Sequence, residues 1–203
     1  MRNTQELVSY LKHSGFIRSD SVESAFLKID RKLFVPEGYV DYAYADIAIP
    51  IKEGVTISAP SVIAETLEMA ELREGMRVLE IGTGSGYSTA LISLCIGSGE
   101  VVSYEIDEDA HNYAKDKIRK ARKESKLGNI RLVLGDGKSV DEGLFDVIIV
   151  NAAFSEIEGS WKKSLKEGGA VVGPMVTNGI ERLTKYKEGE FSYGLPVLYV
   201  RLR

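Results

Sequence analysis

The sequence has little of what stabilises small secreted proteins or builds metal centres. It contains one cysteine and two histidines in 203 residues. Cys95 has no second cysteine with which to form an internal disulfide, and its apolar neighbours indicate a core residue in a reducing compartment. His13 and His111 lie far apart in the chain, so no zinc-type cluster of ligands is expected. The composition therefore argues against a bound metal and against a disulfide-stabilised fold.

Long apolar runs and an excess of basic charge are also missing. No apolar stretch approaches the roughly 18 residues of a membrane-spanning helix, and residues 1–6 are too polar to open a signal peptide. A cytoplasmic protein with no membrane partner is expected. Basic residues number 26 against 30 acidic ones, a net charge of −4, so no nucleic-acid partner is expected. The basic run from Lys115 to Lys126 includes acidic residues at helical spacing, which favours a solvated helix face.

The first 72 residues are predicted to be helical and irregular, in contrast to the rest of the chain. Amphipathic spacing predicts a short helix around Leu7 and Leu11 and a second helix from Asp20 to Ile29. The aromatic, proline-containing stretch from Phe34 to Pro60 is a long loop or a set of short strands, and Pro60 suits the first turn of the helix that follows. Residues 1–72 are thus predicted to be an N-terminal helical cap with a long, functional loop.

Residues 73–203 alternate apolar runs with segments long enough for a helix. This alternation predicts a parallel sheet covered by helices on both faces. Two further runs, Arg182–Tyr186 and Val197–Leu202, have no helix between them and favour an antiparallel pair. The predicted fold class is α/β, Rossmann-like, with a mostly parallel seven-stranded sheet in one compact unit with the cap. The apolar runs predicted as parallel strands are Val78–Ile81, Val101–Glu105, Ile130–Leu134, Val147–Val150 and Ala170–Val172.

The strongest local signal is the glycine-rich loop Gly82-Thr83-Gly84-Ser85-Gly86, which follows the first of these strands and opens a helix. Backbone N–H groups and the helix dipole favour a polar or anionic ligand there, and glycine lets the backbone approach it closely. The third glycine falls one place earlier than in the dinucleotide fingerprint GxGxxG, which weakens a pyrophosphate interpretation. A tight glycine turn that binds nothing is the structural alternative.

Three acidic residues end successive strands. Glu80 precedes the glycine loop, Glu105 ends the second strand, where an acid accepts hydrogen bonds from both ribose hydroxyls, and Asp136 ends the third, where it can accept an amino group such as that of adenine. Ligands of open α/β sheets lie beyond the carboxyl ends of the strands, so the three converge. Each alone is typical of a surface residue or helix cap. Together they favour a nucleoside, and a carboxylate near its reactive end tolerates a sulfonium cation better than a pyrophosphate.

This order of strand, glycine loop and acids resembles the class I methyltransferases over residues 77–175. The resemblance implies S-adenosylmethionine as the methyl donor, with S-adenosylhomocysteine as product. It places Glu80 and the glycines beside the methionine portion, Glu105 at the ribose, and Asp136 with Gly137 at the adenine. The donor-binding residues that it implies are Glu80, Gly82, Thr83, Gly84, Ser85, Gly86, Glu105, Ile106, Asp136 and Gly137.

Four segments before the glycine loop are similar to the protein-L-isoaspartate O-methyltransferases: RKLFVP at 31–36, AYAD at 43–46, IPI at 49–51 and TISAP at 56–60. The resemblance implies methylation of the free carboxyl of L-isoaspartyl or D-aspartyl residues in damaged proteins and peptides, a repair activity. Ser58 would lie beside the transferred methyl group and orient the acceptor, while Tyr44, Asp46 and Pro60 would contact the substrate. Ser61, Glu181 and the C-terminal LYVRL depart from the family pattern, which affects acceptor specificity.

Alternatives stay open at this point. Ser58 precedes a helix and is also a typical N-cap, and Asp46 is a typical turn residue. The segment Asn151-Ala152-Ala153-Phe154 stands where nitrogen-methylating enzymes carry Asn/Asp-Pro-Pro-aromatic, although both prolines are missing. The other functions considered are therefore an N-methyltransferase acting on RNA or a small molecule, and a non-catalytic module that binds the donor and uses the acceptor loop as a partner surface.

Overall fold

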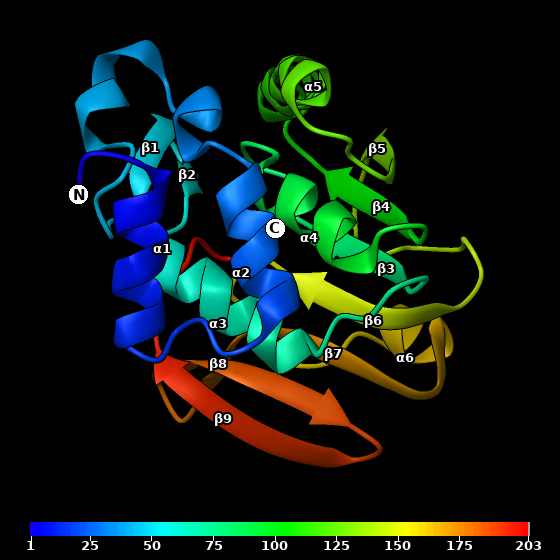
Figure 1. Ribbon diagram of the computed structural model, residues 1–203. Helices are drawn as coiled ribbons and strands as arrows, with labels where there is room; N and C mark the ends of the chain where they lie inside the picture. Colours follow the sequence, from blue (N-terminus) through cyan, green and yellow to red (C-terminus); the bar gives the residue numbers. More distant parts are fainter. Residues whose placement is uncertain (203) are drawn as a thin grey trace.

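A seven-stranded sheet forms the centre of the computed structural model, which describes residues 1–202 (Figure 1). The strand order is β5-β4-β3-β6-β7-β8-β9. The first five strands in this order run parallel to one another. This confirms the α/β class and the five predicted apolar strands. The parallel strands are β3 (Arg77–Ile81), β4 (Glu100–Glu105), β5 (Asn129–Leu134), β6 (Phe145–Val150) and β7 (Leu165–Thr177).

Apolar side chains alternate between the two faces of the sheet. Val78 and Val147 point into the cluster beneath α3 (Pro60–Ala70), α4 (Tyr87–Ile96) and α5 (Glu108–Glu124). Leu79 and Ile148 point into a second cluster that includes Trp161 of α6 (Gly159–Lys163). Helices therefore cover both faces, as predicted. The cap helices α1 (Thr4–His13) and α2 (Asp20–Lys28) join the first cluster, outside α3 and α4 (Figure 1).

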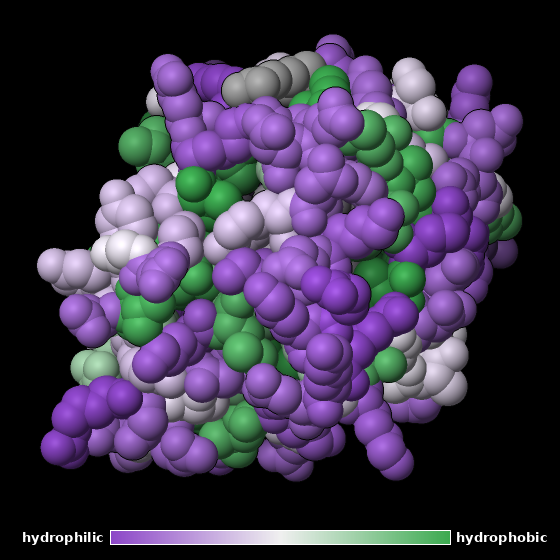
Figure 2. Space-filling view, turned by 90° about the horizontal axis from the view of Figure 1, so that it is seen from above, coloured by the Kyte–Doolittle hydropathy of each residue, from purple (hydrophilic) through white to green (hydrophobic). Residues whose placement is uncertain are grey.

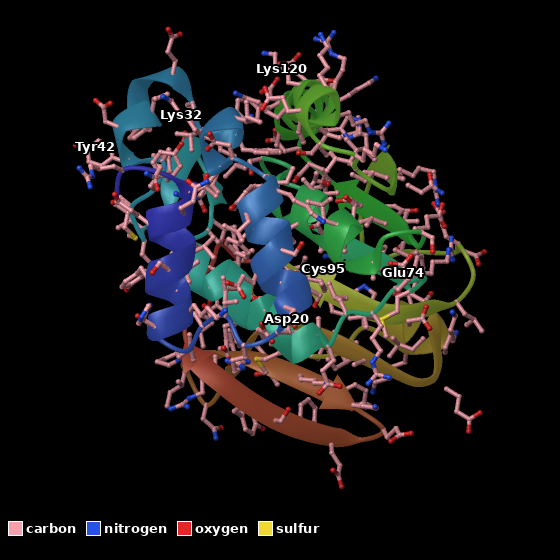
Figure 3. The ribbon with its side chains drawn as sticks, in the orientation of Figure 1. Asp20, Lys32, Tyr42, Glu74, Cys95 and Lys120 are labelled. Carbon is pink, nitrogen blue, oxygen red and sulfur yellow. The ribbon has the colours of Figure 1, made fainter. Side chains whose placement is uncertain are left out.

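The stretch from Phe34 to Pro60, predicted as a long loop or a set of short strands, combines 3-10 turns with one pair of short strands. It begins within the 3-10 turn η1 (Arg31–Phe34) and continues through η2 (Glu37–Tyr42). The two-stranded hairpin of β1 (Ile49–Lys52) and β2 (Val55–Ile57) follows. Pro60 is the first residue of α3, which confirms that prediction. Lys32 and Tyr42 mark η1 and η2 in Figure 3, on the side of the cap away from the sheet.

The predicted pairing of Arg182–Tyr186 with Val197–Leu202 is wrong. The strand β8 (Ile180–Lys187) pairs with β7 and with β9 (Glu190–Pro196), while residues 197–202 leave the sheet. Glu188 and Gly189 both have positive φ, 51° and 91°, which makes a tight hairpin turn whose twist matches paired strands. The segment directly after that turn is therefore the partner of β8. The helix expected between β5 and β6 is also absent among the described residues, where loop 135–144 connects them.

The basic run at 115–126 lies mainly on the solvated face of α5, as predicted. Ala114, Ile118 and Ala121 form the buried stripe of this helix. Lys120 points away from the body of the molecule (Figure 3), and the face seen from above is mainly hydrophilic with separated apolar spots (Figure 2). No helix within residues 1–202 is long and apolar enough to cross a bilayer.

Candidate active site

The carboxyl ends of β3, β4, β5 and β6 border a pocket of about 990 Å³, counting its open mouth. This is the place where open α/β sheets bind ligands. Segments far apart in the chain meet here. They are residues 54–58 at the hairpin, the loop 82–85 with Tyr87 and Ser88, the strand ends 104–107 and 135–137, Asn151–Ala152, and the C-terminal segment 199–202.

The glycine loop forms the floor of the pocket. Gly82 and Gly84 have φ of 91° and 54°, conformations that side chains rarely adopt. The N–H of Gly82 donates to the carbonyl of Tyr104 at 2.8 Å, which ties the loop to β4. A Cβ at Gly84 would lie 3.5 Å from the Thr56 carbonyl oxygen, so the hairpin passes directly over the loop. Thr83 and Ser85 line the same floor.

Glu105 joins this loop to the next strand end. Its carboxylate accepts the Gly84 N–H at 2.8 Å on one oxygen and the Asp107 N–H at 3.0 Å on the other. The residue is 7% exposed and lines the pocket. A carboxylate oxygen accepts two hydrogen bonds, so each retains capacity for a ligand hydroxyl. This arrangement fits a ribose.

Ile106, Asp136 and Gly137 form the adjoining wall. Ile106 is 50% exposed and offers an apolar surface, while the Asp136 carboxylate accepts the Lys138 N–H at 2.9 Å and stays accessible. A Cβ at Gly137 would approach the Ile81 Cγ2 to 2.6 Å, so only glycine fits there without displacing the Ile81 side chain. An apolar surface beside an acceptor suits a flat ring that carries an amino group.

Glu80 lies behind the loop and does not line the pocket, which corrects its predicted contact with the donor. The residue is 0% exposed, and its carboxylate accepts from the hydroxyls of Thr89 and Ser103 and from the Asn151 amide at 2.5, 2.7 and 2.9 Å. Burial raises the pKa of Glu80, and these hydrogen bonds act in the opposite direction. The Asn151 amide also donates to the Gly82 carbonyl, so Glu80 supports the loop from below.

Gly86 is likewise behind the wall. It precedes α4 with φ of 83°, and a Cβ there would lie 3.0 Å from Ile118 of α5. Its predicted place beside the donor is therefore corrected: a glycine is needed for the close packing of α4 on α5.

Ser58 lines the pocket at the end of the hairpin. The residue that caps α3 is Ala59, without a side-chain cap, so the helix-cap alternative for Ser58 is wrong. Ser58 shares the pocket wall with Tyr199. Burial raises the pKa of Tyr199 to about 12, while its side-chain contacts with Ser58 and Thr66 lower it. The two hydroxyl groups therefore lie near each other on the pocket wall.

Tyr44, Asp46 and Pro60 do not line the pocket, and their predicted contacts with the substrate stay a prediction. The Tyr44 hydroxyl donates to both oxygens of Asp30, at 3.0 and 3.1 Å. The Asp46 carboxylate accepts the Ser61 N–H at 2.9 Å and so caps α3 from a distant loop. Pro60 is buried at the start of that helix. All three hold the loop that carries Ser58.

The segment 197–202 is the part of the site that sequence reasoning missed. The Tyr199 N–H donates to the Glu181 carboxylate at 2.5 Å, and Ala153 exchanges backbone hydrogen bonds with Val200 and Leu202 at 2.8 and 2.9 Å. Among the described lining residues Arg201 supplies the positive charge, and Glu105, Asp107 and Asp136 supply the negative ones. The departure of LYVRL and Glu181 from the family pattern was the signal.

The tip of the hairpin is fastened across the pocket. The Lys52 ammonium lies 3.0 Å from the Asp107 carboxylate and 2.7 Å from that of Asp109. Both acids begin α5, and the hydrogen bonds to Asp109 and Asp107 raise the pKa of Lys52. The hairpin is thus a roof that spans from the cap to α5.

The parallel sheet with its glycine loop and the pocket at its carboxyl edge define a Rossmann-like methyltransferase of class I. The family model of protein-L-isoaspartate(D-aspartate) O-methyltransferase matches residues 2–202. The chain belongs to this family.

Similar proteins agree over most of their length. The chain is 41% identical to the protein-L-isoaspartate O-methyltransferase of Pyrococcus horikoshii over 170 residues, 83% of this chain and 75% of that one. It is 40% identical to that of Petrotoga mobilis over 195 residues, 93% and 88% of the two chains. A Plasmodium falciparum structure of a protein-L-isoaspartate O-methyltransferase with S-adenosyl-L-homocysteine superposes with a TM-score of 0.89 at 27% identity, covering 100% and 99% of the two chains.

Proposed function

We propose that the protein transfers the methyl group of S-adenosylmethionine to the free carboxylate of L-isoaspartyl or D-aspartyl residues in damaged proteins and peptides. One observation carries the proposal: the glycine loop, Glu105, Asp136 and Ser58 all line one pocket in a chain of this family. We also propose a cytoplasmic location, with which the free, buried Cys95 is consistent.

The pocket fits the donor. Glu105 would accept the ribose hydroxyls, Asp136 with Ile106 and Gly137 would hold the adenine, and Gly82 to Ser85 would lie along the methionine portion. The close approach of backbone at Gly82, where a Cβ would lie 3.4 Å from Asn151, leaves the cradle free of side chains. When bound, S-adenosylmethionine supplies an electrophilic methyl carbon on a sulfonium.

The chain's own residues would position the acceptor. An acceptor carboxyl has a pKa of about 4 and is anionic at neutral pH, so transfer requires no general base. Its oxygen forms the new bond to the methyl carbon while the carbon–sulfur electron pair moves to sulfur, giving an ester and S-adenosylhomocysteine. Ser58 would orient the carboxylate by a hydrogen bond, and the hairpin and Tyr199 would exclude water. Such positioning contributes about 7–11 kcal/mol in favourable cases.

Asn151 has a structural role that does not favour nitrogen methylation. Its amide N–H groups donate to Glu80 and to the Gly82 carbonyl beneath the loop. The local likeness to the Asn-Pro-Pro-aromatic motif is therefore explained by bracing of the glycine loop.

The deciding experiment is transfer of labelled methyl to an isoaspartyl peptide and to its aspartyl isomer of the same sequence. Base-labile label on the isoaspartyl peptide alone is the expected result, since the product is an ester. Label on RNA contradicts the proposal in favour of an N-methyltransferase. Donor binding without label on any peptide contradicts it in favour of a binding module.

A further inference from the structure

Arg31 is a buried cation with an unusual set of partners. The residue is 1% exposed and begins η1. One terminal nitrogen, Nη1, donates to the carbonyls of Ala43 and Ala45 at 2.8 and 3.4 Å. The other, Nη2, donates to those of Ile47 and Ser58 at 3.0 and 3.2 Å. Its Nε has no partner among the described residues.

No ion pair within residues 1–202 includes Arg31, so four carbonyl dipoles stabilise its charge in place of a carboxylate. Burying a charge in this way carries a large desolvation cost before compensation. A hydrophobic side chain of similar volume would fill the space without that cost. The retained guanidinium therefore calls for a reason other than filling the core, and its planar fork suits several fixed acceptors at once.

The positions of the four carbonyls supply that reason. Ile47 and Ser58 flank the hairpin, whose outermost pair is Ile49 with Ile57. Nη2 bridges these flanking residues and so closes the open end of the hairpin, just as Lys52 fastens its tip. Nη1 ties the preceding loop at 43 and 45 to the same point. Arg31 thus holds Ser58, which lines the pocket, through a hydrogen bond to the Ser58 backbone carbonyl.

We infer that Arg31 is a positioning residue for methyl transfer, which fixes Ser58 and the hairpin roof relative to the donor floor without touching substrate. This inference rests on the proposed function for its catalytic readout. The donor floor is braced separately by Glu80, Glu105 and the strand ends.

The test is a double-mutant cycle of Arg31→Lys with Ser58→Ala. Lysine keeps the charge but has no planar fork to span four carbonyls. We expect Arg31→Lys to lower kcat on an isoaspartyl peptide at least about tenfold, with affinity for S-adenosylhomocysteine changed by about twofold or less. In the Ser58→Ala background the same change should have almost no further effect on kcat, because the residue through which it acts is gone. Independent, multiplying losses would overturn the inference.

Arg77→Lys is the matched control. Arg77 is a half-buried arginine that also donates to two backbone carbonyls, those of Glu142 and Leu144, at the opposite end of β3. We expect it to lower the melting temperature without lowering kcat. Equal loss of kcat in both arginine variants would show a general structural effect and overturn the inference. If Arg31→Lys does not fold, Arg31→Gln, which buries no charge, takes its place in the cycle.

Hydrogen exchange separates this inference from the proposed function. In Arg31→Lys, amides of residues 43–58 should exchange at least about tenfold faster, while those of β3 and β4 stay unchanged. An unchanged rate at 43–58 would overturn the inference. If the wild-type protein methylates no isoaspartyl peptide, the proposed function fails while the exchange result still decides whether Arg31 holds the segment.

Discussion

The donor half and the acceptor half of the pocket are held by different kinds of contact. In the donor half, the glycine loop is tied to neighbouring strand ends by short links such as Gly82 to Tyr104 and Gly84 to Glu105. In the acceptor half, side chains from distant elements hold backbone: Arg31, Asp46 and Glu181 each fasten a loop. The donor half thus follows from the order of strands, whereas the acceptor half depends on individual long-range side chains. Single substitutions should therefore damage the two halves separately.

The largest expected effect is on donor binding. Glu105→Ala removes a buried carboxylate that holds the loop and would accept the ribose hydroxyls. Loss of such a charged acceptor costs about 1–3 kcal/mol, or roughly a 5- to 150-fold weaker affinity for S-adenosylmethionine. Isothermal titration calorimetry measures it. Glu108→Ala, an exposed glutamate three residues on, is the control, and an equal loss there would contradict the prediction.

Ser58→Ala tests the acceptor half. We expect turnover on an isoaspartyl peptide to fall about tenfold while donor affinity stays within about twofold, because Ser58 acts on the acceptor alone. Ser61→Ala is the matched control, since its backbone N–H to Asp46 is retained. Parallel loss of turnover and donor affinity in Ser58→Ala would remove the distinction between the halves.

Lys52→Met tests the roof that joins the halves. The pairs of Lys52 with Asp107 and Asp109 are partly exposed, and such pairs contribute little to stability. Release of S-adenosylhomocysteine should be roughly 2- to 5-fold faster in a stopped-flow assay, and added salt should bring the wild type toward the variant. Lys12→Met, which breaks a pair with Glu23 in the cap, should leave release unchanged.

The smallest expected signal is a pH dependence that Glu80→Gln removes. Burial raises the pKa of Glu80 above the ordinary value of 4.5, so between 4.5 and that raised pKa the folded state holds a proton that the unfolded chain has lost. Its contribution to stability is present below 4.5 and is lost as pH rises through the folded pKa. Urea unfolding of wild type and variant at several pH values measures the difference, with exposed Glu53→Gln as control. A difference that does not change with pH would contradict this.

Local pattern predicted the donor half well. The five parallel strands and the glycine loop follow from apolar runs that end in polar or glycine residues, and topology alone brings Glu105 and Asp136 together. The misplacement of Glu80 was avoidable in principle. Val78 and Glu80 are two residues apart on β3 and share a face, and Val78 packs beneath the helices. Alternation along the strand therefore points Glu80 inward, away from the pocket.

Other errors arise from contacts that no local pattern specifies. The motif AYAD was found, but whether Tyr44 and Asp46 face substrate or scaffold depends on Asp30 and Ser61, 14 and 15 residues away. The pairing of β8 was decided by a turn at Glu188 and Gly189, which freed residues 197–202 to reach the pocket. Sequence identified the important segments there, and long-range hydrogen bonds determined what each residue does.

The burial of the Arg31 charge has a thermal consequence. Hydration of ions becomes less favourable as temperature rises, so the cost of keeping a guanidinium away from water shrinks on heating. Hydrophobic replacements gain no comparable advantage. The desolvation cost of binding one arginine to four carbonyls is therefore lower at high temperature than at low temperature. These hydrogen bonds should keep the methyl-transfer geometry intact close to the unfolding temperature.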